Sequence, residues 1–386
     1  MTEHSADPRD QLGRVDGAGD AAPAPARTDP VERVTPLELF FDLVFVFTIT
    51  QLSTLLTRGL TWTALWHVVV MLGLIYWMYD GYAWLTNAVA AEGARRQGLL
   101  LAGMAGYLVL AIAIPDAFTG TGLTFGIAYL MIIAVHASLY VASASESSSA
   151  AMRALAPVNI AAAIAVLVGG AVGGVAQELV WTTVVLLLWF ATRAGEGFEI
   201  GPAHFVERHG LLILIAIGES VVATGIGAHG LTIDLRLVVT AVLGLLLSAG
   251  LWWTYFGGGV EPVEHAFRAA TGARRVRLAF VGFGYAHYAM LLGVVLAAVG
   301  LRVAVARPAA PLSVGHALAL AGGCALFLVA DGWFRWLLGL RRWRGRWLAG
   351  LVIMLAVPVG TQVSALAGLA ATVVLLAATA LVEQRR

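Results

Sequence analysis

The sequence has no lysine, a single cysteine and little charge of either sign. Only 12% of its 386 residues are charged and 60% are hydrophobic, whereas soluble domains carry about a quarter charged residues. This deficit excludes an ordinary soluble enzyme, a disordered protein and a nucleic-acid-binding protein. Because Cys324 is the one cysteine, an intramolecular disulfide and a thiolate metal cluster are excluded as well. We expect an integral membrane protein.

Long apolar runs take the place of the missing charge. A membrane-crossing helix needs about twenty such residues, whereas β-barrel strands are about ten residues of alternating polarity. The runs predict an all-α, polytopic transmembrane helix bundle of about twelve spans, with ten or eleven as alternatives. The expected spans cover residues 36–57, 62–88, 98–114, 123–143, 154–174, 178–193, 206–228, 235–257, 278–299, 313–334, 347–361 and 363–382. The span 347–361 is short and ends near Pro358, so a re-entrant segment is its alternative.

Arginine is distributed unevenly between the two predicted sides of the membrane. Residues 1–33 are polar and predict a disordered cytoplasmic tail without a secretory signal, ahead of a transmembrane domain over 34–386. The predicted cytoplasmic segments then hold Arg95, Arg96, Arg153, Arg193, Arg268, Arg274, Arg275, Arg277, Arg335, Arg341, Arg342, Arg344, Arg346, Arg385 and Arg386. The predicted outer segments hold Arg58, Arg236, Arg302 and Arg307. This bias predicts a multi-pass protein of the bacterial plasma (inner) membrane with both termini cytoplasmic.

A short internal similarity indicates two parallel six-span repeats, over 34–200 and 201–386. Trp77-Met78-Tyr79-Asp80-Gly81 in the second span resembles Trp253-Thr254-Tyr255-Phe256-Gly257 in the eighth. The first and seventh spans also open with an acidic residue. Many transporters are built from repeats of this kind.

Ionisable residues inside spans are rare, and each is a candidate for a functional site. The span directions put Asp42, Asp80 and Asp331 near the cytoplasmic side. Glu219 lies about 18 Å further along its helix than Glu207, near the midplane. The pattern predicts a polar vestibule leading from the cytoplasm toward Glu219. The predicted substrate and proton pathway consists of Asp42, Gln51, Asp80, Glu207, Arg208, His209 and Glu219, with Glu38, His287 and Asp331 as secondary candidates.

Structural roles compete with these functional ones. Thr35-Pro36-Leu37-Glu38 is typical of a capping box, and Asp42 suits an ion pair with Arg208. Asp80 and Asp331 lie close enough to the interface to be solvated, and His136 and His287 suit hydrogen-bonded interior positions. The aromatic run from Tyr76 to Tyr82 fits either a membrane-interface belt or a pocket shared with Asp80.

No motif for a phosphate loop, a nucleophilic serine, a zinc site or a dinucleotide fold occurs in a suitable context. We therefore predict no catalytic residues, no metal site and no cofactor. The expected partners are the lipid bilayer and an unidentified small solute or ion, no nucleic acid is expected, and a homo-oligomer is left open.

Two blocks of the sequence resemble the bacterial low-temperature requirement A (LtrA) family. One is Leu37-Glu38-Leu39-Phe40-Phe41-Asp42-Leu43-Val44-Phe45-Val46, and the other joins His204-Phe205-Val206-Glu207-Arg208-His209-Gly210 to Ala216-Ile217-Gly218-Glu219-Ser220. The runs Trp84-Leu85-Thr86-Asn87 and Gly284-Tyr285-Ala286-His287-Tyr288 agree with it, and the similarity spans about residues 34–382. One departure is Gly257, where many relatives carry an acidic residue.

The resemblance implies a polytopic bacterial membrane protein named after a cold-growth phenotype, without an established activity. Its signature residues include Glu38, Asp42, Gln51, Glu207, Arg208, His209 and Glu219. The Phe41-Asp42 region is also distantly similar to the first-helix motif of lysosomal-type potassium channels.

Four functions are compatible with these features of the sequence. The leading hypothesis is a proton-coupled secondary transporter with Glu219 and Asp42 as proton carriers. The others are an ion channel, a membrane enzyme acting on a lipid or isoprenoid, and a structural cold-adaptation protein without turnover. An enzyme is the less favoured alternative, because no metal-binding or nucleophilic cluster is recognisable.

Overall fold

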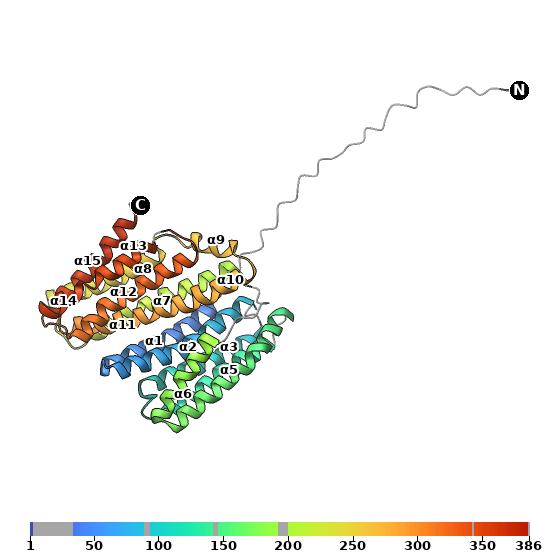
Figure 1. Ribbon diagram of the computed structural model, residues 1–386, viewed down its shortest axis with the longest axis horizontal. Coiled ribbons are helices and arrows are strands. Elements are labelled where there is room, and N and C mark those ends of the chain that lie inside the picture. Colours follow the sequence, from blue (N-terminus) through green and yellow to red (C-terminus); the bar gives the residue numbers. More distant parts are fainter. Residues whose placement is uncertain (3–33, 89–92, 142–145, 192–199, 342, 385–386) are drawn as a thin grey trace. The chain divides into compact units, whose positions relative to one another are not determined.

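The computed structural model describes residues 1–2, 34–88, 93–141, 146–191, 200–341 and 343–384 (Figure 1). Within these ranges every regular element is helical, so the all-α class is confirmed. Nearly all of the predicted tail lies outside the described residues, as do Arg193, Arg342, Arg385 and Arg386. The chain divides into two units, Met1–Glu32 and Arg33–Arg386, and the described helices all belong to the second.

In the residues that the structure describes, the first half of the helical unit contains six α-helices, of which the sixth is short. They are α1 (Pro36–Arg58), α2 (Trp62–Ala88), α3 (Ala94–Ala113), α4 (Gly122–Val141), α5 (Glu146–Val172) and α6 (Gly174–Leu186). A short 3-10 turn, η1 (Ile114–Asp116), follows α3, and a π-helical turn, η2 (Leu187–Ala191), ends the sixth span. The break before α6 lies at Gly173 and Gly174, with φ of 75° and 60°, slightly earlier than the sequence predicts. Glycine tolerates this left-handed backbone without steric cost.

The second half is more segmented. It comprises α7 (Pro202–Ala228), α8 (Leu235–Phe256), α9 (Glu261–Ala269), α10 (Gly272–Leu278), η3 (Ala279–Ala286), α11 (His287–Ala306), α12 (Val314–Leu337), α13 (Trp343–Ile353), α14 (Ala356–Gln362) and α15 (Ala365–Gln384). The amphipathic α9 lies in a segment that the sequence assigns to a loop. The segment η3 is π-helical and joins α10 and α11 into one continuous span.

Eleven described helical segments are long and apolar enough to cross a membrane, and a shorter apolar helix covers Gly174–Phe190. Together they match the expected count of about twelve. The eleventh expected span consists of α13 and α14, which make up a 20-residue segment, Trp343–Gln362. The break between the two helices follows from Pro358, because proline has no N–H to donate to the carbonyl of Met354.

Helix starts follow local capping chemistry. Thr35 caps α1, since its hydroxyl accepts from the Glu38 N–H at 3.3 Å and the Glu38 carboxylate accepts from the Thr35 N–H at 2.8 Å. This confirms the predicted capping box, with Pro36 at the first helical position. Asp234 caps α8 in a similar way by accepting from the Leu237 N–H at 2.7 Å.

Helix neighbours follow the same order in the two halves. In the first, α3 contacts α1 and α4, α5 contacts α4 and α6, and α2 contacts α1, α4 and α6. In the second, α11 contacts α7 and α12, and α13 contacts α12. Both α13 and α14 contact α15, and α8 contacts α7, α12 and α15. The halves meet where α1 and α2 contact α7 and α11, and Figure 1 shows α1 and α2 beside these two helices.

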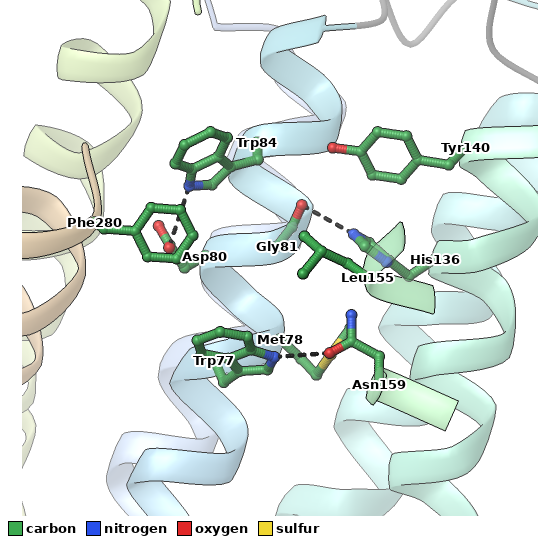
Figure 2. Close-up of a pocket in the computed structure, with 10 residues that line it drawn as sticks. All are labelled: Trp77, Met78, Asp80, Gly81, Trp84, His136, Tyr140, Leu155, Asn159 and Phe280. Atoms are coloured by element: carbon green, nitrogen blue, oxygen red, sulfur yellow. Dashed lines mark hydrogen bonds between the residues drawn. The ribbon is translucent and has the colours of Figure 1, made fainter. Parts of the chain in front are cut away.

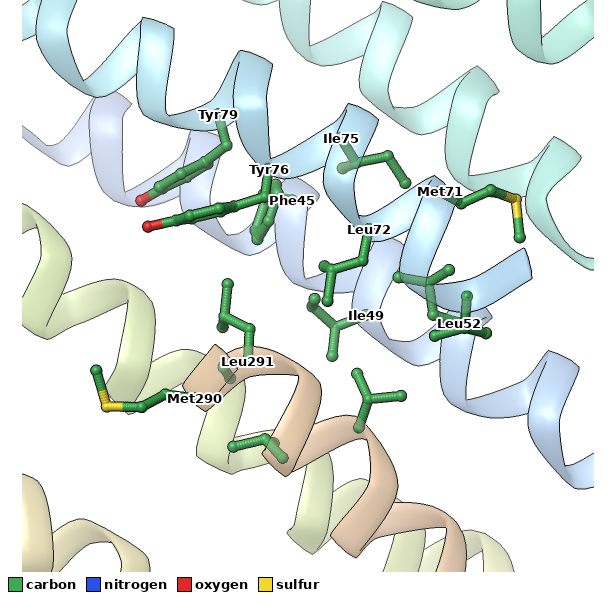
Figure 3. Packing of buried hydrophobic residues seen from close by; sticks show 14 of the residues in the cluster. Phe45, Ile49, Leu52, Met71, Leu72, Ile75, Tyr76, Tyr79, Met290 and Leu291 are labelled. Carbon is green, nitrogen blue, oxygen red and sulfur yellow. The ribbon is translucent and has the colours of Figure 1, made fainter. Parts of the chain in front are cut away.

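Apolar side chains fill the junction between the halves. Figure 3 shows Phe45 and Ile49 of α1 facing α2, with Leu291 of α11 closing the cluster from the other half. Glycines allow α11 and α12 to approach closely: a Cβ added at Gly293 would lie 2.7 Å from the Gly323 carbonyl oxygen. Small residues serve this role between membrane helices in general.

The sidedness of the bundle is testable on the span over α10 to α11. Ala273 and Ala309 are exposed at its opposite ends, and the buried Cys324 is replaced by alanine to give a cysteine-free background. With the predicted topology, a membrane-impermeant maleimide labels Ala309→Cys in intact cells, whereas Ala273→Cys is labelled only after the membrane is opened. The reverse pattern would contradict cytoplasmic termini.

Candidate functional site

Arg208 of α7 joins the two halves through a buried ion-pair cluster. Its Nη2 lies 3.0 Å from Asp42 Oδ1 and its Nη1 lies 3.4 Å from Glu38 Oε1, both on α1. The Tyr79 hydroxyl of α2 donates to the same Asp42 oxygen at 2.9 Å. The guanidinium also lies 5.8 Å from the centre of the Tyr79 ring, a distance at which the ring attracts a cation. The suggested Asp42–Arg208 pair is therefore present.

Glu38 also contacts α7, besides capping α1. His204 of α7 places its Nε2 3.1 Å from Glu38 Oε1. The other ring nitrogen of His204 faces the Asn87 side-chain amide at 3.4 Å, so a neutral His204 satisfies both contacts by donating to Glu38 and accepting from Asn87. Asn87 in turn bonds both the N–H and the carbonyl of Gly201, each at 2.8 Å, and so fixes the start of α7 to the end of α2.

The charges of this cluster do not balance. It holds two carboxylates, Glu38 and Asp42, against the single cation Arg208, and all three are at most 3% exposed. Among the described residues, Asp42 Oδ2 and Arg208 Nε have no hydrogen-bond partner. An unneutralised charge is expensive inside a protein in a membrane. One bound proton would make the cluster neutral.

Asp80 of α2 and His209 of α7 form a second buried pair. His209 Nε2 lies 3.1 Å from Asp80 Oδ1, while His209 Nδ1 lies 2.8 Å from the Phe205 carbonyl. Both atoms facing the ring are acceptors when Asp80 is ionised, so both ring nitrogens must then carry protons. Trp84 donates to the other Asp80 oxygen at 3.2 Å. The pair thus holds one proton more than a neutral imidazole and a carboxylate.

Glu219 lies deeper in α7 and contacts hydroxyls. Its carboxylate oxygens are 2.5 Å from Thr50 Oγ1 and 2.6 Å from Ser53 Oγ of α1. The described residues place no cationic group at ion-pairing distance from it; Arg302 of α11 instead donates to Thr57 Oγ1 at 3.3 Å. Glu219 is thus 1% exposed without an ion-pair partner.

An apolar layer separates Glu219 from the Arg208 cluster. Asp42 and Thr50 are eight residues apart on α1, or about 12 Å along a helix. The fully buried Phe45 and Ile49 of α1 and Ile213 of α7 lie between them. The residues expected to line a vestibule are therefore close-packed in this conformation, and a path from Asp42 to Glu219 requires the helices to move.

The remaining candidates lie outside these three groups. Glu207 is half-buried and accepts from the Val34 N–H at 3.3 Å. Gln51 is half-buried and takes part in none of the bonds described above. His287 is satisfied as a neutral ring, donating to the Gly282 carbonyl and accepting from the Tyr255 hydroxyl, both at 2.9 Å. His136 contacts the Gly81 carbonyl at 3.0 Å.

Asp331 belongs to a separate, charge-balanced network. It lies 3.1 Å from Arg335 Nε and also pairs with Arg346 of α13. Arg346 forms two bonds to Glu383 of α15, at 2.9 and 3.0 Å, and Arg335 donates to the Tyr255 carbonyl of α8 at 2.8 Å. These contacts tie together the ends of four helices. Asp331 is buried and paired here, so the solvated role considered for it is wrong.

Several residues of the site escape sequence reasoning. Thr50 and Ser53 look like ordinary hydroxyls in an apolar helix, although Thr50, Ser53 and Thr57 recur at helical spacing on the α1 face that meets α7. Tyr79 appears in the sequence only as one member of an aromatic run. His204 and Asn87 stand within the family blocks, and only the folded chain shows that Asn87 holds Gly201.

Comparison with known proteins bears on the whole helical unit. A family model described as "Bacterial low temperature requirement A protein (LtrA)" matches residues 33–381. An uncharacterized protein of Rhizobium meliloti (strain 1021) is 28% identical over 327 residues, which cover 80% of this chain and 78% of the relative. Neither description names a reaction or a transported solute.

The Asp331 network predicts a change in stability. Asp331→Asn leaves Arg335 and Arg346 with Glu383 as the one remaining carboxylate, and breaking a buried pair costs about 3–5 kcal/mol. We expect a lower thermal unfolding midpoint in detergent. Glu264→Gln, at the partly exposed Glu264–Arg268 pair, is the matched control and should change stability by at most about 1 kcal/mol. Unchanged unfolding of Asp331→Asn would contradict the structural role.

Proposed function

The chain belongs to the bacterial low temperature requirement A family, and we propose that this polytopic membrane protein is a proton-coupled secondary transporter of a small solute in the bacterial plasma membrane. The observation that carries the proposal is Glu219, a buried carboxyl held by two hydroxyls at the contact between the two halves. A charge at such a place is expensive unless it is neutralised. A proton is the smallest group that neutralises it.

The Arg208 cluster supports proton exchange at a second depth. With two carboxylates for one guanidinium, it takes up one proton to become neutral. Asp42 is the favoured carrier, because Glu38 is engaged by Thr35 and His204 as well as by Arg208. One oxygen of each carboxylate has no hydrogen-bond partner among the described residues.

The arrangement of the halves supports movement between them. The shared order of helix neighbours favours the proposed parallel repeats over 34–200 and 201–386. In transporters built from repeats, one half rocks against the other around a central site. We propose that such a movement opens the apolar layer of Phe45, Ile49 and Ile213 on one side of Glu219 at a time.

An ion channel is a poorer fit to the same helices. A pore needs a continuous polar or water-filled lining, whereas the Asp42 face of α1 continues through the buried Ile49 before reaching Ser53. The polar groups are therefore interrupted at the depth where a channel needs them. The exposed apolar side chains of the bundle are suited to contact with the lipid bilayer.

Proton flux in proteoliposomes tests this function. Wild-type protein with a trapped pH dye is challenged with pools of small metabolites and cations, beside folded Glu219→Gln and Asp42→Asn variants. We expect solute-dependent flux to fall at least tenfold in Glu219→Gln, because glutamine keeps the hydrogen bonds but carries no exchangeable carboxyl proton. Glu178→Gln, a partly exposed carboxyl near His67, is the control and should transport normally.

Two outcomes would contradict the proposal. Flux that persists unchanged in a folded Glu219→Gln protein would remove Glu219 as a carrier. Wild-type vesicles without flux for any pool would argue against a proton-coupled transporter.

A further inference from the structure

A small cavity beside Asp80 is lined by residues of α2, α4, α5 and η3 (Figure 2). Its free volume is about 40 Å³. It is lined by aromatic rings together with a few polar groups, namely Trp77, Trp84, Tyr140 and Phe280 with Asp80, His136 and Asn159. The pathway through Asp42 and Glu219 does not use this cavity.

The lining has the chemistry of a site for an organic cation. The Trp84 and Phe280 rings pack against each other with centroids 5.1 Å apart, and the Trp77 and Phe280 centroids are 6.4 Å apart, so the three rings form one aromatic wall of the cavity. Ring faces attract cations, and aromatic cages recognise ammonium groups. Asp80 is the carboxylate among the lining residues, and it supplies the negative charge that such a cage needs.

Hydrogen bonds hold this lining in place. Trp84 Nε1 donates to Asp80 Oδ2 at 3.2 Å and Trp77 Nε1 donates to Asn159 Oδ1 at 3.1 Å. The dashed lines of Figure 2 show the two indoles fixed in this way, one on each side of Asp80 along α2. Rings positioned before a ligand arrives lose little freedom on binding.

The volume of the cavity and the chemistry of its lining limit which cations could bind there. A water needs roughly 10–15 Å³ of such volume, so the cavity holds about three non-hydrogen atoms. Calcium and similar hard metal ions require six or more oxygen ligands, whereas these walls offer mostly ring carbons, and the described residues contain no group of three acidic, histidine or cysteine side chains suited to a metal. A methylammonium-type ion fits both limits.

The same carboxylate is already paired with a proton-carrying group. His209 Nε2 lies 3.1 Å from Asp80 Oδ1 and needs a proton to bond it. Among the described residues, the other titratable groups near this pair are Asp42, Tyr76, Tyr79, Tyr140 and His287, and His136 lines the same cavity as Asp80. Asp42 is itself paired with Arg208, so His209 is the group placed to balance the charge of Asp80 when both of its ring nitrogens carry protons.

We propose that this cavity binds a small organic ammonium ion, and that the ion replaces the proton of the Asp80–His209 pair. The ion brings one positive charge to Asp80, and His209 releases one proton to water, so the total charge is unchanged. The neutral His209 ring keeps one of its two hydrogen bonds, to either Asp80 or the Phe205 carbonyl. This inference rests on the proposed function and names its substrate class and the exchange of ion for proton.

Calorimetry on the purified full-length protein in detergent measures both parts of the proposal. Methylammonium chloride is titrated in several buffers that differ in their heat of ionisation, which yields the affinity and the number of protons released. We expect saturable binding with close to one proton released per ion. Tetramethylammonium, with five non-hydrogen atoms, and potassium should bind at least tenfold more weakly.

Variants distinguish the binding of the cation from the release of the proton. Asp80→Asn should weaken methylammonium binding at least tenfold, and Phe280→Leu by roughly threefold to thirtyfold, as expected for the loss of one cation–ring contact. His209→Gln removes the competing charge but keeps a donor to Asp80, so it should bind methylammonium more tightly and release no proton. Glu264→Gln, far along the chain on α9, is the matched control and should behave as wild type.

Three results would overturn the inference: no saturable methylammonium binding to wild type, undiminished binding to folded Asp80→Asn, or proton release that persists in His209→Gln. The His209→Gln arm remains decisive if Asp80→Asn fails to fold. Binding with proton release but without methylammonium-driven flux in vesicles would uphold the site and contradict transport. Flux with another solute, in a protein that does not bind methylammonium, would uphold the transport function and contradict the cation site.

Discussion

The ion pairs of Arg208 with Glu38 and Asp42 are the interaction on which the arrangement of the two halves depends. They join α7 to α1 near one end of both helices, where water is scarce and separating charges is costly. Asn87 fixes the start of α7 from α2, and His204 adds its bond to Glu38. The parallel α1 and α7 meet again further along, where Thr50 and Ser53 hold Glu219. The contact between the halves is therefore polar at two depths and apolar between them.

This pattern suits a protein whose halves move. A uniformly apolar contact would hold the helices in one position by close packing, whereas carboxylates exchange a proton as their surroundings change. The π-helical segment η3 adds to this chemistry, because its altered bonding leaves carbonyls available: Tyr76 donates to Phe283 and His287 bonds Gly282. Such π-turns frequently occur at functional sites. Asp331, by contrast, lies in a balanced network that holds helix ends together.

Local chemistry made part of the structure predictable. Apolar length indicated the spans, and Thr35 and Pro36 indicated the start of α1. Contacts between distant segments were beyond such reasoning: nothing near Asp80 in the sequence points to His209, and nothing near Glu219 points to Thr50. Those pairs arise from the packing of α7 against α1 and α2, and local patterns in a single sequence do not reveal which helices pack together. The break between α13 and α14 had a local signal in Pro358, although the sequence left a re-entrant segment as an alternative.

The central claim is that Glu219 takes up and releases a proton within the folded protein. Infrared difference spectroscopy between acidic and alkaline buffers, on wild type and Glu219→Gln reconstituted in lipid, tests it most directly. The account predicts a protonated-carboxyl C=O band that changes with pH in wild type and is absent from the Glu219→Gln difference spectrum. Identical carboxyl bands in the two proteins would show that Glu219 keeps one protonation state, and would contradict its role as a carrier.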